Sequence, residues 1–453
     1  MTDSPPNTDG DTIASIATPP GTGALALIRM SGPEAIAIAR RCMGGTPFEV
    51  RRATLRRVTD AEGKPIDQVV ATCFAGPASF TGEETVEISC HGGLLVTRRL
   101  LSRLLEEGAR PAEPGEFSQR AFLNGKLDLT QAEAVMDVIS AESDLALRAA
   151  QNQLEGAIGR RVGSAAEALV RLTAHVEAHI DFPDEDISPD TTQQLLANLT
   201  AIREQLADLL DTADQGRLLR EGVRTAIVGR PNAGKSSLLN ALLGHERAIV
   251  SSVAGTTRDT IEENVHLGGL CLRLIDTAGL HDSGDAIERA GMERSLRAEA
   301  EADLVLEVAD ASLAPDRLDL PETRALRLLI LNKADLGVHP AWDEAISDGV
   351  ILFSCKAGTG RAELEHMLSS RFVQVHAMSS SGGLAAINER HRHALGTAIE
   401  ALDAAATSLN AGVSPELTAL DLRDALDALG AITGRIDTED ILSAVFSQFC
   451  LGK

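Results

Sequence analysis

The spacing of hydrophobic and polar positions changes near residue 126, from short mixed elements to long helices. Before that point, apolar runs of strand length alternate with amphipathic segments of helix length. The strand-like runs span 12–17, 25–30, 69–74 and 85–89, and the helical segments span 33–42 and 95–107. This alternation predicts an α+β domain over residues 1–125.

Beyond Leu129 the apolar residues follow a helical period. One stripe repeats at spacings of three and four, through Leu154, Ile158, Val162, Ala166, Leu169, Thr173, Val176 and Ile180. We expect this stripe to be core, and an acidic, proline-containing stretch at 181–186 to end the helix. A second amphipathic helix is predicted from 191 to 219. Helical texture returns at 386–409, 414–429 and 438–448, after a Ser/Gly-rich linker.

Strands and helices alternate between these two helical regions, from Val223 to about Phe372. Because the flanking regions are alike in composition, we predict one helical domain with a nucleotide-binding domain inserted in it. The expected limits are 1–125 for the α+β domain, 126–221 and 377–453 for the helical domain, and 222–376 for the insertion. The fold class is therefore a multidomain combination of α/β and all-α parts.

Composition narrows the possible partners. The formal net charge is −24, and aromatic residues make up 2% of the chain, with no Tyr. An RNA partner would need a local basic patch or a second protein, and base stacking on an aromatic platform is not expected. No apolar run is long enough to span a membrane, so we expect a cytoplasmic protein. The six cysteines are widely separated, which favours free thiols.

The sequence from Gly229 to Ser236 fills every fixed position of the G-x-x-x-x-G-K-[ST] phosphate loop, between an apolar strand and a helix. Lys235 would reach the β- and γ-phosphates, and the Ser236 hydroxyl would bind Mg²⁺. The nucleotide contacts expected in this loop are Asn232, Ala233, Gly234, Lys235, Ser236 and Ser237.

Two further motifs indicate guanine. Asn332, Lys333 and Asp335 form an N-K-x-D at a strand end, where the Asp335 carboxylate would accept hydrogen bonds from guanine N1–H and the exocyclic amine. Ser354, Cys355 and Lys356 follow the next strand and would contact the base through main-chain N–H groups. Adenine presents the wrong donors to such a carboxylate, so a Ras-like GTPase domain is predicted.

The switch motifs lie between these. The stretch Gly255, Thr256, Thr257 supplies a threonine, Thr257, for Mg²⁺, and D-T-A-G at Asp276, Thr277, Ala278 and Gly279 would sense the γ-phosphate through the Gly279 N–H. Leu280 stands where Ras-like GTPases carry a water-orienting Gln. Glu288 is the candidate for that task, with a place on a helical surface as the alternative. Lys235, Thr257, Gly279 and Glu288 are thus the expected catalytic residues.

Most of the chain resembles the family of tRNA modification GTPases known as MnmE or TrmE. The resemblance rests on T-I-A-S-I-A-T-P-P-G from Thr12, T-G-E-E-T-V-E from Thr81 and P-G-E-F-S-Q-R-A-F-L-N-G-K-L-D-L from Pro114. It also rests on D-F-P-D-E-D-I from Asp181, L-G-A-I-T-G-R from Leu429 and the terminal F-C-L-G-K.

The resemblance implies a K⁺-activated GTPase acting on the wobble uridine of certain tRNAs, at carbon 5, with a flavoprotein of the MnmG (GidA) type. It implies a homodimer that binds a one-carbon tetrahydrofolate, in its formyl or methylene form. The matching folate positions are Arg29, Glu87, Lys126 and Lys453. K⁺ falls at Asn232, with Ser251, Val253 and Thr256, and the nucleotide contacts extend to Ser252 and Ala254. Glu288 matches the water-positioning acid.

Two other functions stay open. One is a ribosome-assembly GTPase of the Era or EngA type, which a single GTPase domain without a following RNA-binding module disfavours. The other is a folate-dependent aminomethyl transferase with a regulatory GTPase. Thr22 and His281 depart from the family pattern: Thr22 removes a possible basic contact near the folate, and His281 follows D-T-A-G-L where the family often carries Arg. Cys450 is expected to be a packing residue, with a nucleophile as the alternative.

Overall fold

The computed structural model describes residues 10–44, 47–181, 192–244, 263–275, 302–316, 325–343, 349–377, 386–412, 414–434, 442, 445–447, 449–450 and 452. They fall into two compact units. The first unit comprises residues 1–136, 159–199 and 397–453, and the second comprises residues 137–158 and 200–396. Each unit therefore combines segments that are far apart in the sequence.

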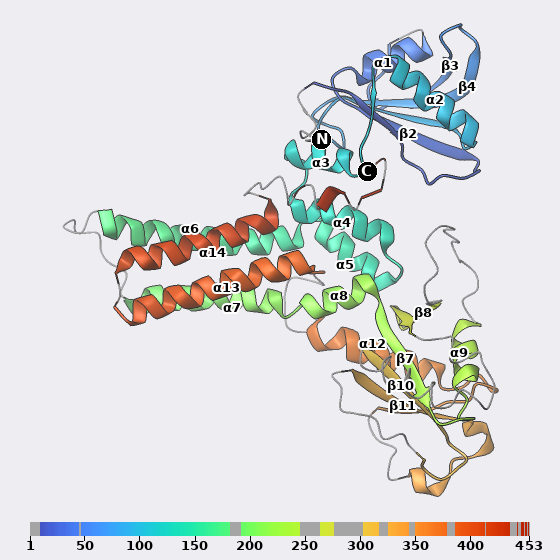
Figure 1. Ribbon diagram of the computed structural model, residues 1–453, viewed down its shortest axis with the longest axis vertical. Helices are drawn as coiled ribbons and strands as arrows, with labels where there is room; N and C mark the ends of the chain where they lie inside the picture. Colours follow the sequence, from blue (N-terminus) through green and yellow to red (C-terminus); the bar gives the residue numbers. More distant parts are fainter. Residues whose placement is uncertain are drawn as a thin grey trace, which may run out of the picture. The chain divides into compact units, whose positions relative to one another are not determined.

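A six-stranded sheet in the order β3-β4-β5-β2-β1-β6 forms the amino-terminal part of the first unit (Figure 1). Its strands are β1 (Ile13–Ile16), β2 (Leu25–Ser31), β3 (Thr54–Thr59), β4 (Pro65–Phe74), β5 (Thr85–His91) and β6 (Arg110–Pro111). All neighbours are antiparallel except β1 and β6. Helices α1 (Ala35–Met43) and α2 (Leu94–Glu106) share one apolar core with the sheet, which includes Ile38, Leu100 and Ile88.

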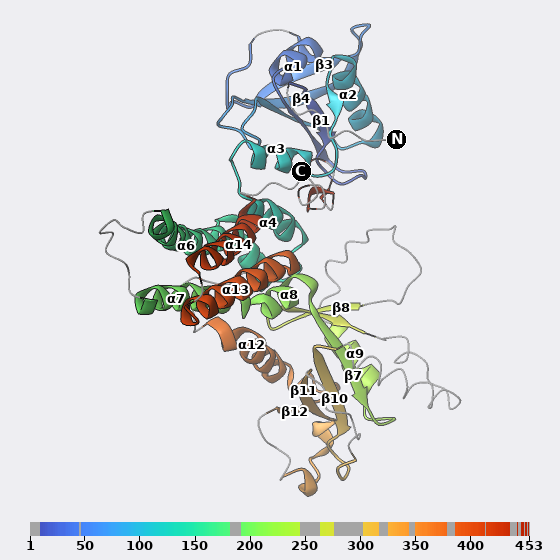
Figure 2. The same ribbon diagram turned by 60° about the vertical axis from the view of Figure 1, so that its left-hand side comes forward.

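Helices make up the rest of the first unit. They are α3 (Glu116–Leu123), α4 (Leu129–Ser140) up to Met136, most of α6 (Ala157–Asp181), the start of α7 (Thr192–Leu210) up to Leu199, most of α13 (Glu389–Asn410) and all of α14 (Pro415–Thr433). Helices α6 and α14 lie side by side (Figure 2), and Arg423 of α14 forms an ion pair of 2.6 Å with Glu177 of α6. Phe446 and Phe449 pack against Leu129 and Ala132 of α4, so residues near 450 cover the start of this helical region.

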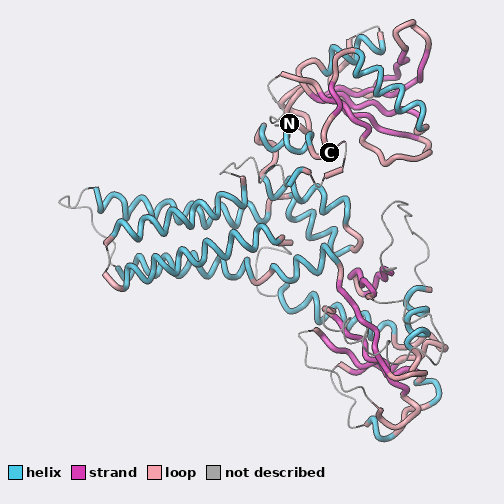
Figure 3. Tube along the Cα trace, in the orientation of Figure 1, coloured by secondary structure: helices cyan, strands magenta, loops and turns pink. Residues whose placement is uncertain are grey.

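The second unit contains a six-stranded sheet in the order β12-β11-β10-β7-β9-β8, which Figure 3 distinguishes from its helices by colour. The strands are β7 (Val223–Gly229), β8 (Glu263–Leu267), β9 (Leu270–Leu274), β10 (Leu304–Asp310), β11 (Leu326–Asn332) and β12 (Val350–Leu352). All pairs are parallel except β8 with β9. The helical elements are α5 (Asp144–Leu154), the end of α7 (Thr192–Leu210), α8 (Ala213–Glu221), α9 (Lys235–Leu243), η1 (Ala334–Leu336), η2 (Pro340–Trp342), α12 (Arg361–Ala377) and the start of α13.

The predicted core stripe is confirmed, since Ile158, Val162, Leu169 and Val176 are buried along α6. Two continuous helices were predicted wrongly. A break at residues 155–156 separates α5 from α6, with Gly156 at a φ of 83°. A turn at residues 211–212 separates α7 from α8, where the Thr212 N–H donates to the Leu209 carbonyl.

Strand β3 was not expected, because arginines interrupt its apolar alternation.

All six cysteines are free, as predicted, and burial raises the pKa of Cys42, Cys73 and Cys90 to about 11. Cys450 is exposed, so its expected packing role is wrong. Among the described helices, none is both long and apolar enough to cross a membrane.

Candidate functional site

The phosphate loop connects β7 to α9 in a conformation that requires glycine at two positions. Gly229 has a φ of 154°, and a Cβ there would lie 2.2 Å from the Val308 carbonyl oxygen on β10. Gly234 has a φ of 102°, and a Cβ there would lie 2.1 Å from Asn332 Nδ2. Both contacts are far below van der Waals distance, so the two motif glycines are fixed by close approach as well as by backbone conformation.

Lys235 begins α9 and turns its ammonium back over the loop. Its Nζ donates to the Gly229 carbonyl at 2.9 Å and to the Arg230 carbonyl at 3.1 Å. Burial lowers the pKa of Lys235, and no acidic side chain among the described residues offsets this. Nucleotide phosphates would supply the missing negative charge, and the N-terminus of α9 adds its partial positive charge at the same place.

Asn332, at the end of β11, joins the base motif to the phosphate loop. Its Nδ2 donates to the Ala233 carbonyl at 3.2 Å, and its Oδ1 accepts from the Cys355 N–H at 3.3 Å. Asn332 is buried, and it thus connects two segments of the predicted guanine site with the phosphate loop.

Lys333 adds a second connection. Its Nζ donates to the Asn232 carbonyl at 2.8 Å and to Asp310 Oδ2 at 2.7 Å. Burial alone would raise the pKa of Asp310, but hydrogen bonds from Lys333 and Ser312 hold that pKa below its usual value. Asp310, which the sequence reasoning missed, follows the same rule as the predicted residues, since it ends a parallel strand of this sheet.

On the base side, Asp335 is exposed and accepts a hydrogen bond of 2.6 Å from Ser354 Oγ. Ser354 Oγ in turn accepts from the Ala357 N–H at 3.0 Å, which fixes the loop after β12. Burial raises the pKa of the Cys355 thiol, so this cysteine is a neutral neighbour of the base motif. The structure therefore brings together Asn232, Ala233, Gly234, Lys235, Asn332, Lys333, Asp335, Ser354 and Cys355 around the carboxyl ends of β7, β11 and β12.

Several predicted residues lie outside the described part of the chain. They are Ser251, Ser252, Val253, Ala254, Gly255, Thr256, Thr257, Asp276, Thr277, Ala278, Gly279, Glu288 and Lys453. The hairpin of β8 and β9 connects the two stretches that contain the switch motifs, because β8 begins at Glu263 and β9 ends at Leu274.

The hairpin has a contact outside the nucleotide-binding sheet. Asn264 Nδ2 donates to Glu142 Oε2 at 3.0 Å, and Cys271 Sγ lies 3.3 Å from the same oxygen. Glu142 stands between α4 and α5, so one carboxylate holds both strands of the hairpin that joins the switch motifs.

In the first unit, Arg29 and Glu87 are direct cross-strand partners on β2 and β5. Arg29 Nε and Nη2 donate to Glu87 Oε1 at 3.1 and 2.8 Å, and Arg29 Nη1 lies 3.5 Å from the Gly452 carbonyl. The guanidinium also lies 5.2 Å from the ring centroid of Phe80 and 5.8 Å from that of Phe117. Two predicted folate positions are thus adjacent, and residues near 450 reach them.

Lys126 is exposed, and its Nζ donates to the Pro77 carbonyl at 3.1 Å. It lines a cavity of about 700 Å³ together with Asp128, Gln131 and Gly434. Neither Arg29 nor Glu87 lines that cavity. The structure therefore does not bring Lys126 into direct contact with the Arg29–Glu87 pair.

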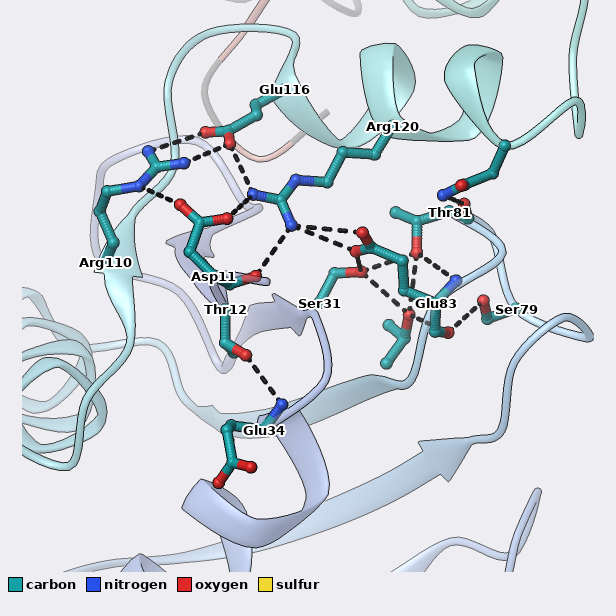
Figure 4. A network of polar contacts seen from close by, with 12 residues as sticks. Asp11, Thr12, Ser31, Glu34, Ser79, Thr81, Glu83, Arg110, Glu116 and Arg120 are labelled. Carbon is teal, nitrogen blue, oxygen red and sulfur yellow. Dashed lines mark hydrogen bonds and ion pairs between the residues drawn. The ribbon is translucent and has the colours of Figure 1, made fainter. Parts of the chain in front are cut away.

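An ionic network centred on the buried Arg120 adjoins this region (Figure 4). Sequence reasoning did not find this network. Arg120 of α3 donates to Asp11 Oδ1 at 2.5 Å, to Glu116 Oε1 at 2.9 Å and to Glu83 at 3.3 Å. Arg110 donates to Glu116 and Asp11 from the other side. Burial alone would raise the pKa of Glu116, but hydrogen bonds from Arg110, the Glu113 N–H and Arg120 lower it. The available signal was the i,i+4 spacing of Glu116 and Arg120.

Two models of protein families match this chain. Residues 12–126 match the family model described as GTP-binding protein TrmE N-terminus, and residues 129–450 match the MnmE helical domain. The tRNA modification GTPase MnmE of Akkermansia muciniphila is 59% identical over 447 residues, which cover 98% of this chain and 99% of that protein. The chain belongs to the MnmE family of tRNA modification GTPases.

Other MnmE proteins align over the same extent. Those of Opitutus terrae and Salinibacter ruber are 46% and 44% identical, each covering 98% of this chain and 99% of its own length. A solved GTP-binding protein from Sulfolobus solfataricus in complex with GDP is 15% identical over 60% of this chain and 82% of its own, with a TM-score of 0.25. The MnmE assignment confirms the predicted family and its fold class, and makes the chain a GTPase.

Proposed function

We propose that this chain is a K⁺-activated GTPase that modifies carbon 5 of the wobble uridine of certain tRNAs, together with a flavoprotein of the MnmG type. It would act in the cytoplasm as a homodimer and install an aminomethyl or carboxymethylaminomethyl group. The observation that carries the proposal is the match to MnmE proteins over 98% of the chain, combined with a phosphate loop joined to N-K-A-D.

The described residues support GTP as the substrate. Asn332 and Lys333 tie the loop that would hold the phosphates to the motif that would hold the base. The Asp335 carboxylate is exposed at the strand end, where it would accept from guanine. A loop already held by these bonds would lose little conformational entropy on binding GTP.

Two cations complete the proposed site. The Ser236 hydroxyl at the start of α9 suits Mg²⁺, which prefers oxygen ligands and phosphate, and Thr257 would be its second protein ligand. K⁺ would be held by Asn232 with Ser251, Val253 and Thr256, and would offset charge that develops between the β- and γ-phosphates. Asn232 has a φ of 61°, a conformation that asparagine tolerates better than most residues.

The catalytic water needs a positioning group, since Leu280 cannot accept or donate a hydrogen bond through its side chain. We assign this task to Glu288, with Lys235 stabilising phosphate charge and with Thr257 and Gly279 responding to the γ-phosphate. GTP hydrolysis would then drive a conformational change rather than the chemistry on the tRNA base.

The one-carbon unit would come from a tetrahydrofolate bound near Arg29, Glu87, Lys126 and Lys453. The Arg29–Glu87 pair suits this task, because it presents a fixed cation and a fixed carboxylate beside two aromatic rings. The cation would bind a folate carboxylate, and the carboxylate would accept from the amino group of the pterin.

The direct test is the nucleoside composition of bulk tRNA from a strain in which the gene is deleted. We expect wobble uridines without the substituent at carbon 5, restored by a plasmid copy of the wild-type gene. A Lys235→Ala copy should fail to restore it. Unchanged nucleoside composition in the deletion strain would overturn the tRNA assignment and leave the GTPase without a known target.

A further inference from the structure

Strand β3 forms an edge of the amino-terminal sheet, and together with the residues directly before it this strand carries an unusual density of positive charge. Residues 51–57 read R-R-A-T-L-R-R, so four arginines fall within seven positions of a chain whose net charge is −24. Helix α1 packs against this strand and ends beside it with exposed Arg40. We call Arg40, Arg51, Arg52, Arg56 and Arg57 the basic edge.

These side chains lie on both sides of the edge strand. Arg57 and Leu55 are exposed on the face opposite to α1 and α2, whereas Arg56 alternates with them and stacks on Phe48, with 4.8 Å between Cζ and the ring centroid. Arg40 and Arg56 are the two cations whose charges act on the buried Cys73 thiol of β4. Both side chains therefore lie near β4, the strand that pairs with β3. The positive charge therefore continues around the rim of the sheet.

At least two arginines of the basic edge have no carboxylate partner among the described residues. Among the described residues, Arg52 pairs with Glu49 at 2.6 Å, and both side chains remain exposed. Asp60 uses Oδ1 to accept the Glu62 and Lys64 N–H groups in its own turn. In the same described part of the chain, neither Arg40 nor Arg57 takes part in an ion pair.

We propose that the basic edge binds the phosphate backbone of tRNA. This inference rests on the proposed function, in which tRNA is the substrate. The six residues of β3 span about 20 Å and carry Arg56 and Arg57, and Arg51 and Arg52 directly before the strand extend this length, so the basic edge is long enough to follow several consecutive phosphates. With 2% aromatic residues and no Tyr, the chain has little capacity for base stacking, so contact through phosphates is the available mode.

Arginines at a sheet edge can also have a role other than RNA binding, because charges on an edge strand prevent pairing with the edge of another sheet. The two uses differ in what their loss changes. Loss of edge protection increases self-association and leaves RNA affinity alone. Loss of phosphate contacts lowers affinity equally for all tRNA sequences and reduces its dependence on salt.

The test compares two charge-matched double variants of the full chain. Arg40→Gln/Arg57→Gln removes two exposed arginines of the basic edge that form no ion pair among the described residues, and Arg148→Gln/Arg171→Gln removes two exposed arginines on α5 and α6. Binding of fluorescein-labelled bulk tRNA is followed by fluorescence anisotropy from 50 to 300 mM KCl. Sedimentation velocity and GTP turnover are measured in parallel.

We expect the basic-edge variant to bind tRNA about tenfold more weakly at 100 mM salt, with a salt slope reduced by about two. The control variant should bind as the wild type does, and all three proteins should hydrolyse GTP equally. Equal affinity of both variants and the wild type would overturn the proposal, as would weaker binding of the control to the same degree. Self-association of the basic-edge variant with unchanged RNA affinity would assign the edge to protection of the sheet.

The outcome is separable from that of the proposed function. Unchanged wobble nucleosides in the deletion strain would reject tRNA modification, while the anisotropy measurement would still decide whether this edge binds RNA. Conversely, a wild-type chain that binds no tRNA in isolation would reject the basic edge as an RNA site and leave the nucleoside test intact.

Discussion

The Asn332 side-chain amide occupies the space that a side chain at Gly234 would need. Its Nδ2 would lie 2.1 Å from a Cβ at that position, and it donates to the neighbouring Ala233 carbonyl. The glycine of the phosphate loop and the asparagine of the base motif are therefore one packing unit, although about a hundred residues separate them.

Gly234→Ala should consequently lower the affinity for GDP by at least about tenfold, since a strained backbone and a buried amide must both give way. The affinity is measured by titration with a fluorescent GDP analogue. Gly412→Ala is the matched control, because Gly412 also has a positive φ, of 62°, but nothing lies within 4 Å of its Cβ position. Normal affinity in Gly234→Ala would show that the loop adapts without cost.

The monovalent ion gives a second prediction. If K⁺ is held at Asn232, GTP turnover in K⁺ should exceed that in Na⁺ by at least about tenfold at equal ionic strength, because the larger ion suits the site and offsets developing charge. Asn232→Ala should remove the difference by lowering turnover in K⁺. Equal rates in the two salts would exclude the monovalent-ion role.

For Glu288→Ala we expect near-normal binding of GTP with turnover reduced by about 100-fold or more, the loss typical of a missing water-positioning group. Single-turnover hydrolysis measured together with nucleotide affinity separates the two effects. Glu363→Ala on α12 serves as a control with the same change of charge. Wild-type turnover in Glu288→Ala would show that Glu288 does not position the catalytic water and would favour its alternative assignment as a helical surface residue.

The strand register supplies a fourth prediction. Arg29 and Glu87 face each other across β2 and β5, so Arg29→Gln should weaken binding of a formyl tetrahydrofolate by about tenfold or more. Isothermal titration gives the affinity, and Lys64→Gln in the exposed β3–β4 turn is the control. Glu87→Gln keeps the shape and tests the carboxylate alone. Unaltered folate binding in both Arg29→Gln and Glu87→Gln would place the folate elsewhere.

The ionic network around Glu116 predicts that the free energy of unfolding depends on pH. Hydrogen bonds from Arg110 and Arg120 hold the pKa of Glu116 below its usual 4.5, so this carboxylate stabilises the fold above that pH. The contribution is lost as pH falls below 4.5 through the folded-state value. Glu116→Gln should lower the free energy of unfolding by about 3 kcal/mol at pH 7.

The measurement is urea denaturation between pH 3 and 7, with the exposed Glu62→Gln as the control. The Glu116→Gln protein should lose less of its stability than the wild type as the solution is acidified, because the group that titrates has been removed. Parallel curves for the two proteins would show that other carboxylates dominate acid unfolding.

Local chemistry explains which features the sequence predicted. The phosphate loop and N-K-A-D combine fixed residue types with a strand-to-loop context, and the structure brings Lys235, Asn332 and Asp335 to the same sheet edge. The periodic burial along α6 was also predicted from the spacing of its apolar residues. The turn between α7 and α8 was missed because neither proline nor glycine marks residues 211–212.

Contacts between distant segments were beyond local patterns. The ion pairs that Arg120 makes with Asp11 and Glu83 depend on how α3 packs against the sheet, which no spacing reveals. The link between Lys333 and Asp310 needed the strand order, since β10 and β11 are neighbours. Strand β3 was missed because its arginines, which we assign to RNA, replace the apolar residues that would have revealed it.

The contact between Gly452 and Arg29 determines the order in which the two proposed sites can form during synthesis of the chain. A Cβ at Gly452 would lie 2.6 Å from Ala17 Cα, directly after β1, and a Cβ at Gly115 would lie 2.5 Å from the Phe446 carbonyl oxygen. Gly452 and Phe446 leave the ribosome after both sheets have been made. The amino-terminal domain can fold early, but the surroundings of Arg29 are completed only after the nucleotide-binding sheet has been made, so a nascent chain would acquire its nucleotide site before the proposed folate site.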